Sequence, residues 1–153
     1  MKKLLTILML AMCLAALLSV TAGAAGGNLE KDTDGYYKIE DYEDLFAFAG
    51  LVNGDSFGAN AKLMKEINAS ASNPASAAYD SALVWTPIGT ITNGYNRTFD
   101  GQGYSIIGLY FHNDSAEYAG LFGNVSGGTV KNVTLTGGQH YRPELCRRHR
   151  RLL

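Results

Sequence analysis

Residues Gly103–Phe111 read Gly-Tyr-Ser-Ile-Ile-Gly-Leu-Tyr-Phe, and residues Gly127–Leu135 read Gly-Gly-Thr-Val-Lys-Asn-Val-Thr-Leu. Both stretches open on glycine, continue with Ser or Thr and a β-branched residue, and end on a large apolar residue. The offset of 24 residues leaves no room for a helix and indicates stacked strand-and-turn units, as in the rungs of a β-solenoid. We therefore expect four apolar side chains to point inward, one above the other: Ile106, Leu109, Val130 and Val133.

The first residues have the three parts of a secretory signal peptide, which we assign to residues 1–24. Lys2 and Lys3 form the positive start, Leu4–Val20 the apolar run, and Ala22-Gly23-Ala24 a small-residue cleavage site. The alternative is a transmembrane anchor, but the run is near the lower limit for crossing a bilayer and no charged stop follows it. We expect an exported chain that is secreted or held at the cell surface, with no stable membrane span after cleavage.

The composition of the remaining chain limits the kinds of partner it can have. The chain has two cysteines, Cys13 and Cys146, so the exported part has no disulfide framework and no thiolate metal site. Leaving out Lys2, Lys3 and the residues after His140, 6 basic and 13 acidic residues remain, a net charge of 6 − 13 = −7. A surface of that sign disfavours nucleic acid and anionic membranes.

An acidic stretch precedes the first expected strand. Glu30–Gly35 spaces Glu30, Asp32 and Asp34 as the front of an EF-hand loop spaces its ligands, with Asp41 at the twelfth position. However, Glu30 is an unusual first ligand, Asp41 is short, and no helix signal precedes the stretch. A solvated acidic turn is the simpler interpretation, and calcium binding stays open.

One amphipathic helix is predicted, over residues Tyr42–Val52, after a short strand at Tyr36–Ile39. Asp41 is a good N-cap, Asn53-Gly54 a good C-terminal stop, and the apolar residues recur at helical spacing. The alternative is a helix that lies on a membrane or on a partner, but its polar face lacks the basic residues that membranes attract. We expect it to cover the open end of a stack of strands. Residues 25–60 would then be an N-terminal strand and cap, ahead of rungs over 61–137.

The centre of the chain alternates between strand and loop signals. Ala61–Ile67 reads as a strand with Leu63 and Ile67 inward, and Ala69–Ala82 as a surface loop. Trp85 lies beside Val84 and Ile88. It fits a core position better than an exposed platform for stacking a sugar.

Several of these segments together resemble a known group of proteins. The group is the bacterial secreted or surface β-helix proteins with GLUG-type repeats, found in adhesin-like proteins and in the non-catalytic N-terminal regions of IgA-cleaving metallopeptidases. The similar segments are Leu45–Asn53, Trp85–Gly89, Thr98–Gly103, Ile106–Leu109, Tyr118–Gly123 and Thr129–Val133. The resemblance implies an all-β fold of right-handed parallel β-helix rungs with one short N-terminal capping α-helix. It also implies extracellular adhesion, display or spacing, with a cell-surface glycan or protein as partner.

The residues from 138 to 153 break this pattern. They contain five arginines, Pro143 and no strand alternation, where the resemblance calls for another glycine-rich rung. A basic tail can bind nucleic acid or an anionic surface, yet a one-base shift of the reading frame allows Tyr-Val-Gly-Gly-Ile-Ala-Gly here, a sequence like Tyr118–Gly123. We therefore expect a frameshifted, truncated fragment in which Gln139–Leu153 stays disordered and outside the fold.

Motifs of catalysis are absent from the sequence. It lacks His-Glu-x-x-His, Gly-x-Ser-x-Gly and a phosphate-binding loop, and its three histidines have no metal-ligand spacing: His112, His140 and His149. We predict no catalytic, cofactor-binding or metal-binding residues, no cofactor and a non-enzymatic role. The alternative is part of a carbohydrate-active β-helix enzyme. Its candidate residues are the acids Asp100, Asp114 and Glu117 and the aromatic platforms Trp85, Tyr95, Tyr104, Tyr110 and Tyr118.

Overall fold

The computed structural model describes residues 29–54, 59–112 and 120–141. These residues form short β-strands, one α-helix and two single-turn 3₁₀ helices. The elements, in chain order, are β1 (Tyr37–Ile39), α2 (Tyr42–Asn53), β2 (Ala61–Leu63), β3 (Ile67–Asn68), η1 (Ser70–Ser72), η2 (Ser81–Leu83), β4 (Thr98–Asp100), β5 (Ser105–Ile107), β6 (Tyr110–His112), β7 (Thr129–Lys131), β8 (Thr134–Thr136) and β9 (Gln139–Tyr141).

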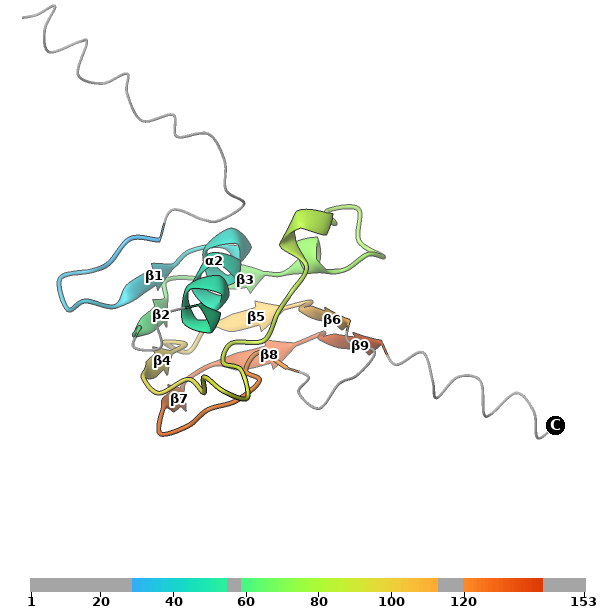
Figure 1. The fold of residues 1–153 in the computed structure, drawn as a ribbon. Coiled ribbons are helices and arrows are strands. Elements are labelled where there is room, and N and C mark those ends of the chain that lie inside the picture. The colour runs from blue at the N-terminus through green and yellow to red at the C-terminus, as the bar shows by residue number, and fades with distance from the viewer. Residues whose placement is uncertain (1–28, 55–58, 113–119, 142–153) are drawn as a thin grey trace, which may run out of the picture.

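Every pairing between these strands is parallel. One sheet has the order β1-β2-β4-β7, a second has the order β3-β5-β8, and the third pairs β6 with β9. The chain therefore contributes strands to the sheets in turn and then returns to the first sheet. We call each such circuit a pass, and each later pass lies beside the one before (Figure 1). The mostly-strand architecture with one helix agrees with the sequence prediction.

The predicted helix is present, and its ends are fixed by local contacts. Asp41 caps the N-terminus, because its Oδ1 accepts a hydrogen bond of 2.9 Å from the Asp44 N–H. Asp44 returns the contact, since its Oδ2 accepts from the Glu40 N–H at 3.0 Å. This reciprocal pair resembles a capping box, with the acceptor shifted by one residue. Gly54 ends the helix by donating to the Gly50 carbonyl.

The apolar stripe of α2 is buried as predicted. Leu45, Phe48, Ala49 and Val52 all lie in the core, and Figure 1 shows α2 at the end of the stack that carries β1. Phe48 contacts three aromatic rings, those of Tyr37, Tyr95 and Phe99, at centroid distances of 6.1, 6.2 and 6.1 Å. The helix thus joins strands β1 and β4 to the segment that precedes β4.

Two predictions about strands and loops need correction. Ala61–Ile67 is two strands with a bend between them, although Leu63 and Ile67 do point inward. The segment 69–82 is not only a surface loop, because Ser72 is buried and its Oγ both donates to the Ala69 carbonyl and accepts from the Tyr110 N–H. A residue that satisfies the backbone of β6 in this way cannot lie on the surface.

The 24-residue offset between the two glycine-led stretches is not the offset at which their strands pair. Phe99 pairs with Val130, 31 positions later, and Ile106 pairs with Leu135, 29 positions later. An offset of 24 does occur, but between Tyr37 and Ala61. The two glycine-led stretches share a local strand pattern, while the register is set by which inward side chains stack.

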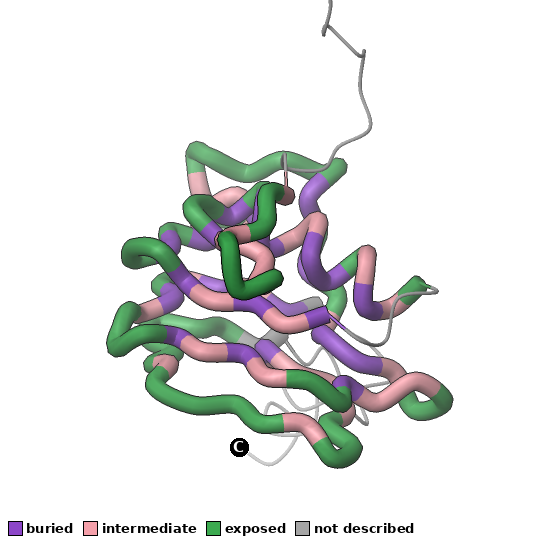
Figure 2. Tube along the Cα trace, turned by 90° about the vertical axis from the view of Figure 1, so that its left-hand side faces the viewer, coloured by how far each residue is buried: buried purple, intermediate pink, exposed green. Residues whose placement is uncertain are grey.

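The prediction of four stacked inward side chains is half right. Ile106 and Leu109 are buried, whereas Val133 is partly buried and Val130 is 38% exposed. Val130 belongs to the last described pass and lies in register with buried Phe99, so it points toward the interior with no described strand beyond it. Figure 2 shows this pass largely in the colour of exposed residues. We call Val125, Val130, Val133 and Leu135 the open end.

The expected boundary of the tail is also wrong. Gln139–Tyr141 forms β9 and pairs in parallel with β6, so the fold includes these residues. Pro143 and all five arginines of the tail come after Tyr141, so they do not prevent a strand before them. Residues 142–153 and the predicted signal peptide, residues 1–24, lie outside the described residues.

One side chain fastens the end of α2 to the middle of the chain. The Asn53 amide donates to the Pro87 carbonyl at 2.9 Å and accepts from the Gly89 N–H at 2.8 Å. We predict that Asn53→Asp, which keeps the acceptor and loses the donor, lowers the free energy of unfolding by about 1–3 kcal/mol, because the partly buried Pro87 carbonyl loses its donor and faces a new charge. Urea denaturation measures this. Glu43→Ala, on the exposed face of the same helix, is the control and should change stability by less than about 0.5 kcal/mol.

Candidate functional site

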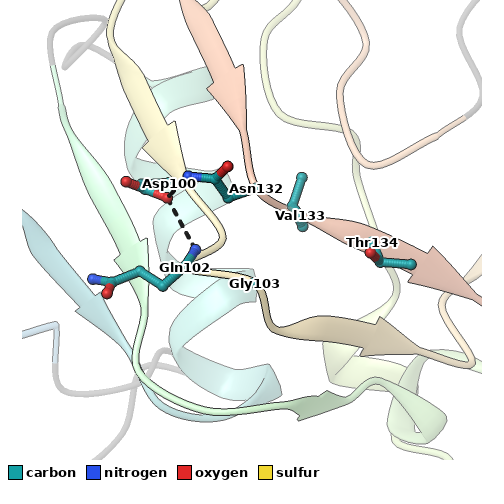
Figure 3. A pocket seen from close by; sticks show the side chains of 6 residues that line it. All are labelled: Asp100, Gln102, Gly103, Asn132, Val133 and Thr134. Atoms are coloured by element: carbon teal, nitrogen blue, oxygen red, sulfur yellow. Dashed lines mark hydrogen bonds between the residues drawn. The ribbon is translucent and has the colours of Figure 1, made fainter.

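A shallow polar hollow lies where the first sheet turns into the second. Its lining comes from the end of β4, the start of β8 and the turns after β4 and β7: Asp100, Gln102, Gly103, Asn132, Val133 and Thr134 (Figure 3). Its volume is about 550 Å³. Residues 31 positions apart in the chain meet here because β4 and β7 are in parallel register.

Left-handed backbone conformations turn the chain at both levels of this corner. Gln102 and Asn132 have φ values of 51° and 54°, and they are the non-glycine residues with positive φ in the described part of the chain. Asn tolerates this region better than most residues because its short amide can bond locally. The two turns are joined directly, since the Gly103 N–H donates to the Asn132 carbonyl at 2.8 Å.

Asp100 is the charged centre of the hollow, and its oxygens are already occupied. Oδ1 accepts from the Gln102 N–H at 2.9 Å and from Asn132 Nδ2 at 3.1 Å, while Oδ2 lies 3.2 Å from Lys131 Nζ. The Gln102 N–H, the Asn132 amide and the Lys131 ammonium together hold the pKa of Asp100 below its usual value, with the Gln102 hydrogen bond the largest cause. The carboxyl is therefore ionised near neutral pH, which suits a structural anchor and not a general acid.

The chemistry of this corner is that of hydrogen bonding. The lining contains one carboxylate, and glycoside hydrolysis in its usual form needs two that face one substrate. The Gln102 amide and the Thr134 hydroxyl also line the hollow, and such groups bind hydroxylated or amide-bearing ligands. The site can hold a polar group without activating it.

The predicted aromatic platforms are scattered, and two of them belong to the core. Trp85 is buried and donates its indole N–H to the Gly120 carbonyl at 3.0 Å, as the sequence predicted for a core position. Tyr95 is buried and donates its hydroxyl to the Ala59 carbonyl at 3.0 Å. Tyr104 is 40% exposed and comes directly after Gly103, one of the residues that line the hollow. Tyr110 is partly buried in β6.

The other predicted residues do not gather at the hollow. His112 and His140 lie in the paired strands β6 and β9. Asp114, Glu117, Tyr118 and His149 lie outside the described residues. Sequence reasoning found Asp100 but missed Gln102 and Asn132. A usable signal was present at Asn132, which occupies the turn position after a short strand where left-handed backbone favours Asn.

The acidic stretch is arranged as a salt-bridged turn. Glu30 Oε2 lies 2.8 Å from Lys38 Nζ, and Asp32 Oδ2 pairs with Lys62. Asp32 Oδ1 accepts from the Asp34 and Tyr36 N–H groups, and Asp41 caps α2. Within the residues that the structure describes, no group of three or more His, Cys, Asp or Glu side chains is placed to hold a metal ion. Three of the carboxylates that an EF-hand loop would use thus have other partners in this fold: Glu30, Asp32 and Asp41.

Comparison with known proteins gives one partial relative. A protein of Evansella cellulosilytica described as a "Putative Gly-rich membrane protein" is 39% identical over 54 residues, which is 35% of this chain and 6% of that protein. The chain therefore spans a small part of this relative's length. No protein family matches the chain, and no solved structure matches it. Among the described residues, no helix is both long enough and apolar enough to cross a bilayer.

The contacts of Asp100 give a prediction for pH dependence. A carboxylate whose pKa is lowered by folding stabilises the fold above its unfolded pKa, and this contribution is lost as the pH falls through the lower folded value. We expect wild type to exceed Asp100→Asn in unfolding free energy near neutral pH, and the difference to shrink at about pH 2.5. Urea denaturation of both proteins at each pH measures this difference.

Lys131→Gln is the matched variant for that experiment. It keeps the carboxylate and its hydrogen bonds to Gln102 and Asn132 but removes the cation. The loss of unfolding free energy between neutral pH and about pH 2.5 should therefore be smaller than that of wild type and larger than that of Asp100→Asn. A difference between wild type and Asp100→Asn that is the same at both pH values would contradict the assigned contacts.

Proposed function

We propose that the described residues belong to a right-handed parallel β-helix, with α2 as its N-terminal cap. The support is the order of the sheets: each of the three receives one strand from each of the last two passes, in parallel register throughout. The inward positions form columns such as Ala61–Phe99–Val130 and Ile67–Ile106–Leu135. Right-handedness follows the general rule that crossovers between parallel strands turn that way.

We propose further that this β-helix is a non-catalytic, exported, surface-associated segment used for adhesion, display or spacing. The observation that carries this is the hollow itself: its carboxylate is neutralised by Lys131 and bonded to Asn132, so it anchors a corner of the stack. The stacked sheets form a rigid support, and a rigid support with variable surface turns is suited to presenting groups away from a cell.

The location at the cell surface rests on two further points. The segment 1–24 has the sequence of an export signal. The Evansella protein is described as a Gly-rich membrane protein, which is compatible with a place at the cell envelope. The resemblance to surface β-helix proteins with GLUG-type repeats agrees with both, and makes a glycan or protein of a cell surface the expected partner.

The alternative, part of a carbohydrate-active β-helix enzyme, is favoured by one observation. Tyr104 is exposed and follows Gly103, which lines the hollow with Asp100 and polar amides, and sugars bind to combinations of aromatic and polar groups. Against it stands the pKa of Asp100, which its hydrogen bonds and Lys131 hold below the usual value, so that Asp100 is poorly suited to be the general acid of glycoside hydrolysis.

Surface labelling tests the proposed location. An epitope inserted at Pro74–Ser76, in an exposed turn, should be reached by antibody and by added protease on intact bacterial cells or in their medium. A variant without residues 1–24 is the control and should remain inside the cell. An epitope that is inaccessible in the full chain would overturn the proposed location.

A panel of polysaccharides separates the two functions. The non-catalytic function predicts no cleavage by the full chain, together with retention on one or more immobilised glycans or surface proteins. Cleavage of any polysaccharide that is abolished by Asp100→Ala would establish the enzyme instead.

A further inference from the structure

Three side chains of the open end point toward the interior of the stack and still contact solvent. Val130, Leu135 and Val125 lie in register with Phe99, Ile106 and Tyr95, which are fully buried. Yet their own exposed fractions are 38%, 45% and 41%. Their strand register places these three side chains in line with core residues, but solvent still reaches them. An apolar patch of this kind on a soluble domain marks a contact surface.

The backbone at the open end also has unused pairing capacity. The Thr129 N–H donates to the Arg97 carbonyl, and the Lys131 carbonyl accepts from the Gly101 N–H, so these two residues face β4. In β8, Thr134 and Thr136 face the preceding pass in the same way, through Tyr104 and Gly108. Because alternate residues of a strand point their amides to opposite sides, the N–H and C=O groups of Val130 and Leu135 face outward along the stack.

The opposite end of the stack is closed and does not offer a matching surface. The edge of β1 is covered by the preceding residues, since the Lys38 N–H donates to the Glu30 carbonyl at 2.8 Å and Lys31 bridges Tyr37 in antiparallel fashion. The apolar space beside β1 is filled by Phe48 and the other buried residues of α2. A second molecule therefore cannot dock its open end onto this end without displacing the cap.

The charge of the open end permits contact with an identical surface. Strand β7 reads Thr-Val-Lys and strand β8 reads Thr-Leu-Thr. Of these six residues three are Thr, two are apolar, and Lys131 alone is charged. Lys131 is paired with Asp100, so two copies meet without an unpaired like charge. These strands also lack the proline and unpaired charges with which proteins protect an exposed edge.

We propose that the open end binds the open end of a second copy of this chain. Around a two-fold axis the edges of β7 and β8 in one copy would run antiparallel to those in its partner, and Val125, Val130, Val133 and Leu135 would be buried from both sides. Such a contact is self-complementary and uses up both open ends, so the assembly stops at two chains.

Light scattering coupled to size-exclusion chromatography tests the proposal. The full sequence is expressed in an exporting bacterial host, and the purified product is run over a range of concentrations with a reducing agent present, so that Cys146 cannot link two chains. We expect a mass that rises with concentration from one chain to two chains and no further. A single-chain mass at every concentration up to about 100 µM, or a series of species larger than two chains, would overturn the proposal.

Substitutions place the contact on the molecule. Leu135→Lys and Val130→Lys should each raise the dissociation constant of the dimer at least about tenfold, because each places an ammonium group in the centre of the contact. Met64→Lys is the matched control and should leave the dissociation constant unchanged, because Met64 is 38% exposed and donates its N–H to the Ile39 carbonyl, at the end of the stack that carries β1. Circular dichroism checks folding, and Val130→Lys decides if Leu135→Lys does not fold. Equal weakening by Met64→Lys would contradict the proposed surface.

Discussion

Phe48→Ala is expected to lower the free energy of unfolding by about 3–5 kcal/mol, the usual range for removing a buried Phe. Phe48 is fully buried and reaches three aromatic rings from different segments: Tyr37 in β1, Tyr95 before β4 and Phe99 in β4. Removing it takes away the side chain through which α2 holds the first and third passes together. Urea denaturation followed by circular dichroism measures the loss.

Phe46→Ala is the matched control on the same helix. Phe46 is partly buried and makes a tilted ring contact with Tyr42 at a centroid distance of 6.5 Å. We expect it to cost less than half as much as Phe48→Ala, because less apolar area leaves water on folding. If the two substitutions destabilise the chain equally, α2 is not the cap that the buried face of the helix implies.

A set of three glycine substitutions has the second large expected effect. Gly89 has φ of +83°, and a methyl group there would lie 2.2 Å from the Asn124 carbonyl oxygen. Gly35 has nearly the same φ, +82°, with no atom within 4 Å of an added methyl group. Gly101 lacks a positive φ, but an added methyl group would lie 2.3 Å from the Asn132 carbonyl oxygen. The set thus separates backbone strain from crowding between passes.

We expect Gly35→Ala to cost about 1–2 kcal/mol from backbone strain and Gly101→Ala about 1–3 kcal/mol from crowding. Gly89→Ala should cost roughly the sum of the two, about 2–5 kcal/mol, because both penalties apply and the obstructing atom is backbone. Thermal and urea denaturation of the three variants provide the comparison. A Gly89→Ala protein no less stable than Gly35→Ala would show that the passes are not packed as closely as the Gly89 backbone indicates.

The parts of the fold that depend on neighbours in sequence were predictable. The helix, its Asp41 cap and its Gly54 stop follow from residues within four positions of one another, and the structure confirms all three. Trp85 was expected in the core for the apolar residues beside it, and it is there. Local patterns also located the strand at Tyr37–Ile39 and the strand segments within Ala61–Ile67, but they missed the break between Leu63 and Ile67 and the strand at Gln139–Tyr141.

The register was not predictable from the same patterns. Gly103–Phe111 and Gly127–Leu135 share a pattern of residue classes, but the match reflects what any short inward-facing strand needs after a turn. The partner of Ile106 is Leu135 because the intervening turn lengths bring those two side chains into one column. The hollow was missed for the same reason, since Asp100 meets Asn132 only once the 31-residue register is known.

The distances along the chain between paired strands bear on how the molecule folds. Partners are separated by 24 residues at Tyr37 and Ala61, by 39 at Ile67 and Ile106, and by 31 at Phe99 and Val130. No named strand pairs with its immediate neighbour through a tight hairpin in the described part of the chain. A high contact order of this kind slows folding, because loop closure must come before any pairing is gained. Each pass needs the previous one as its template, so the structure should grow from the α2 end toward β9, in the order in which a ribosome releases the chain.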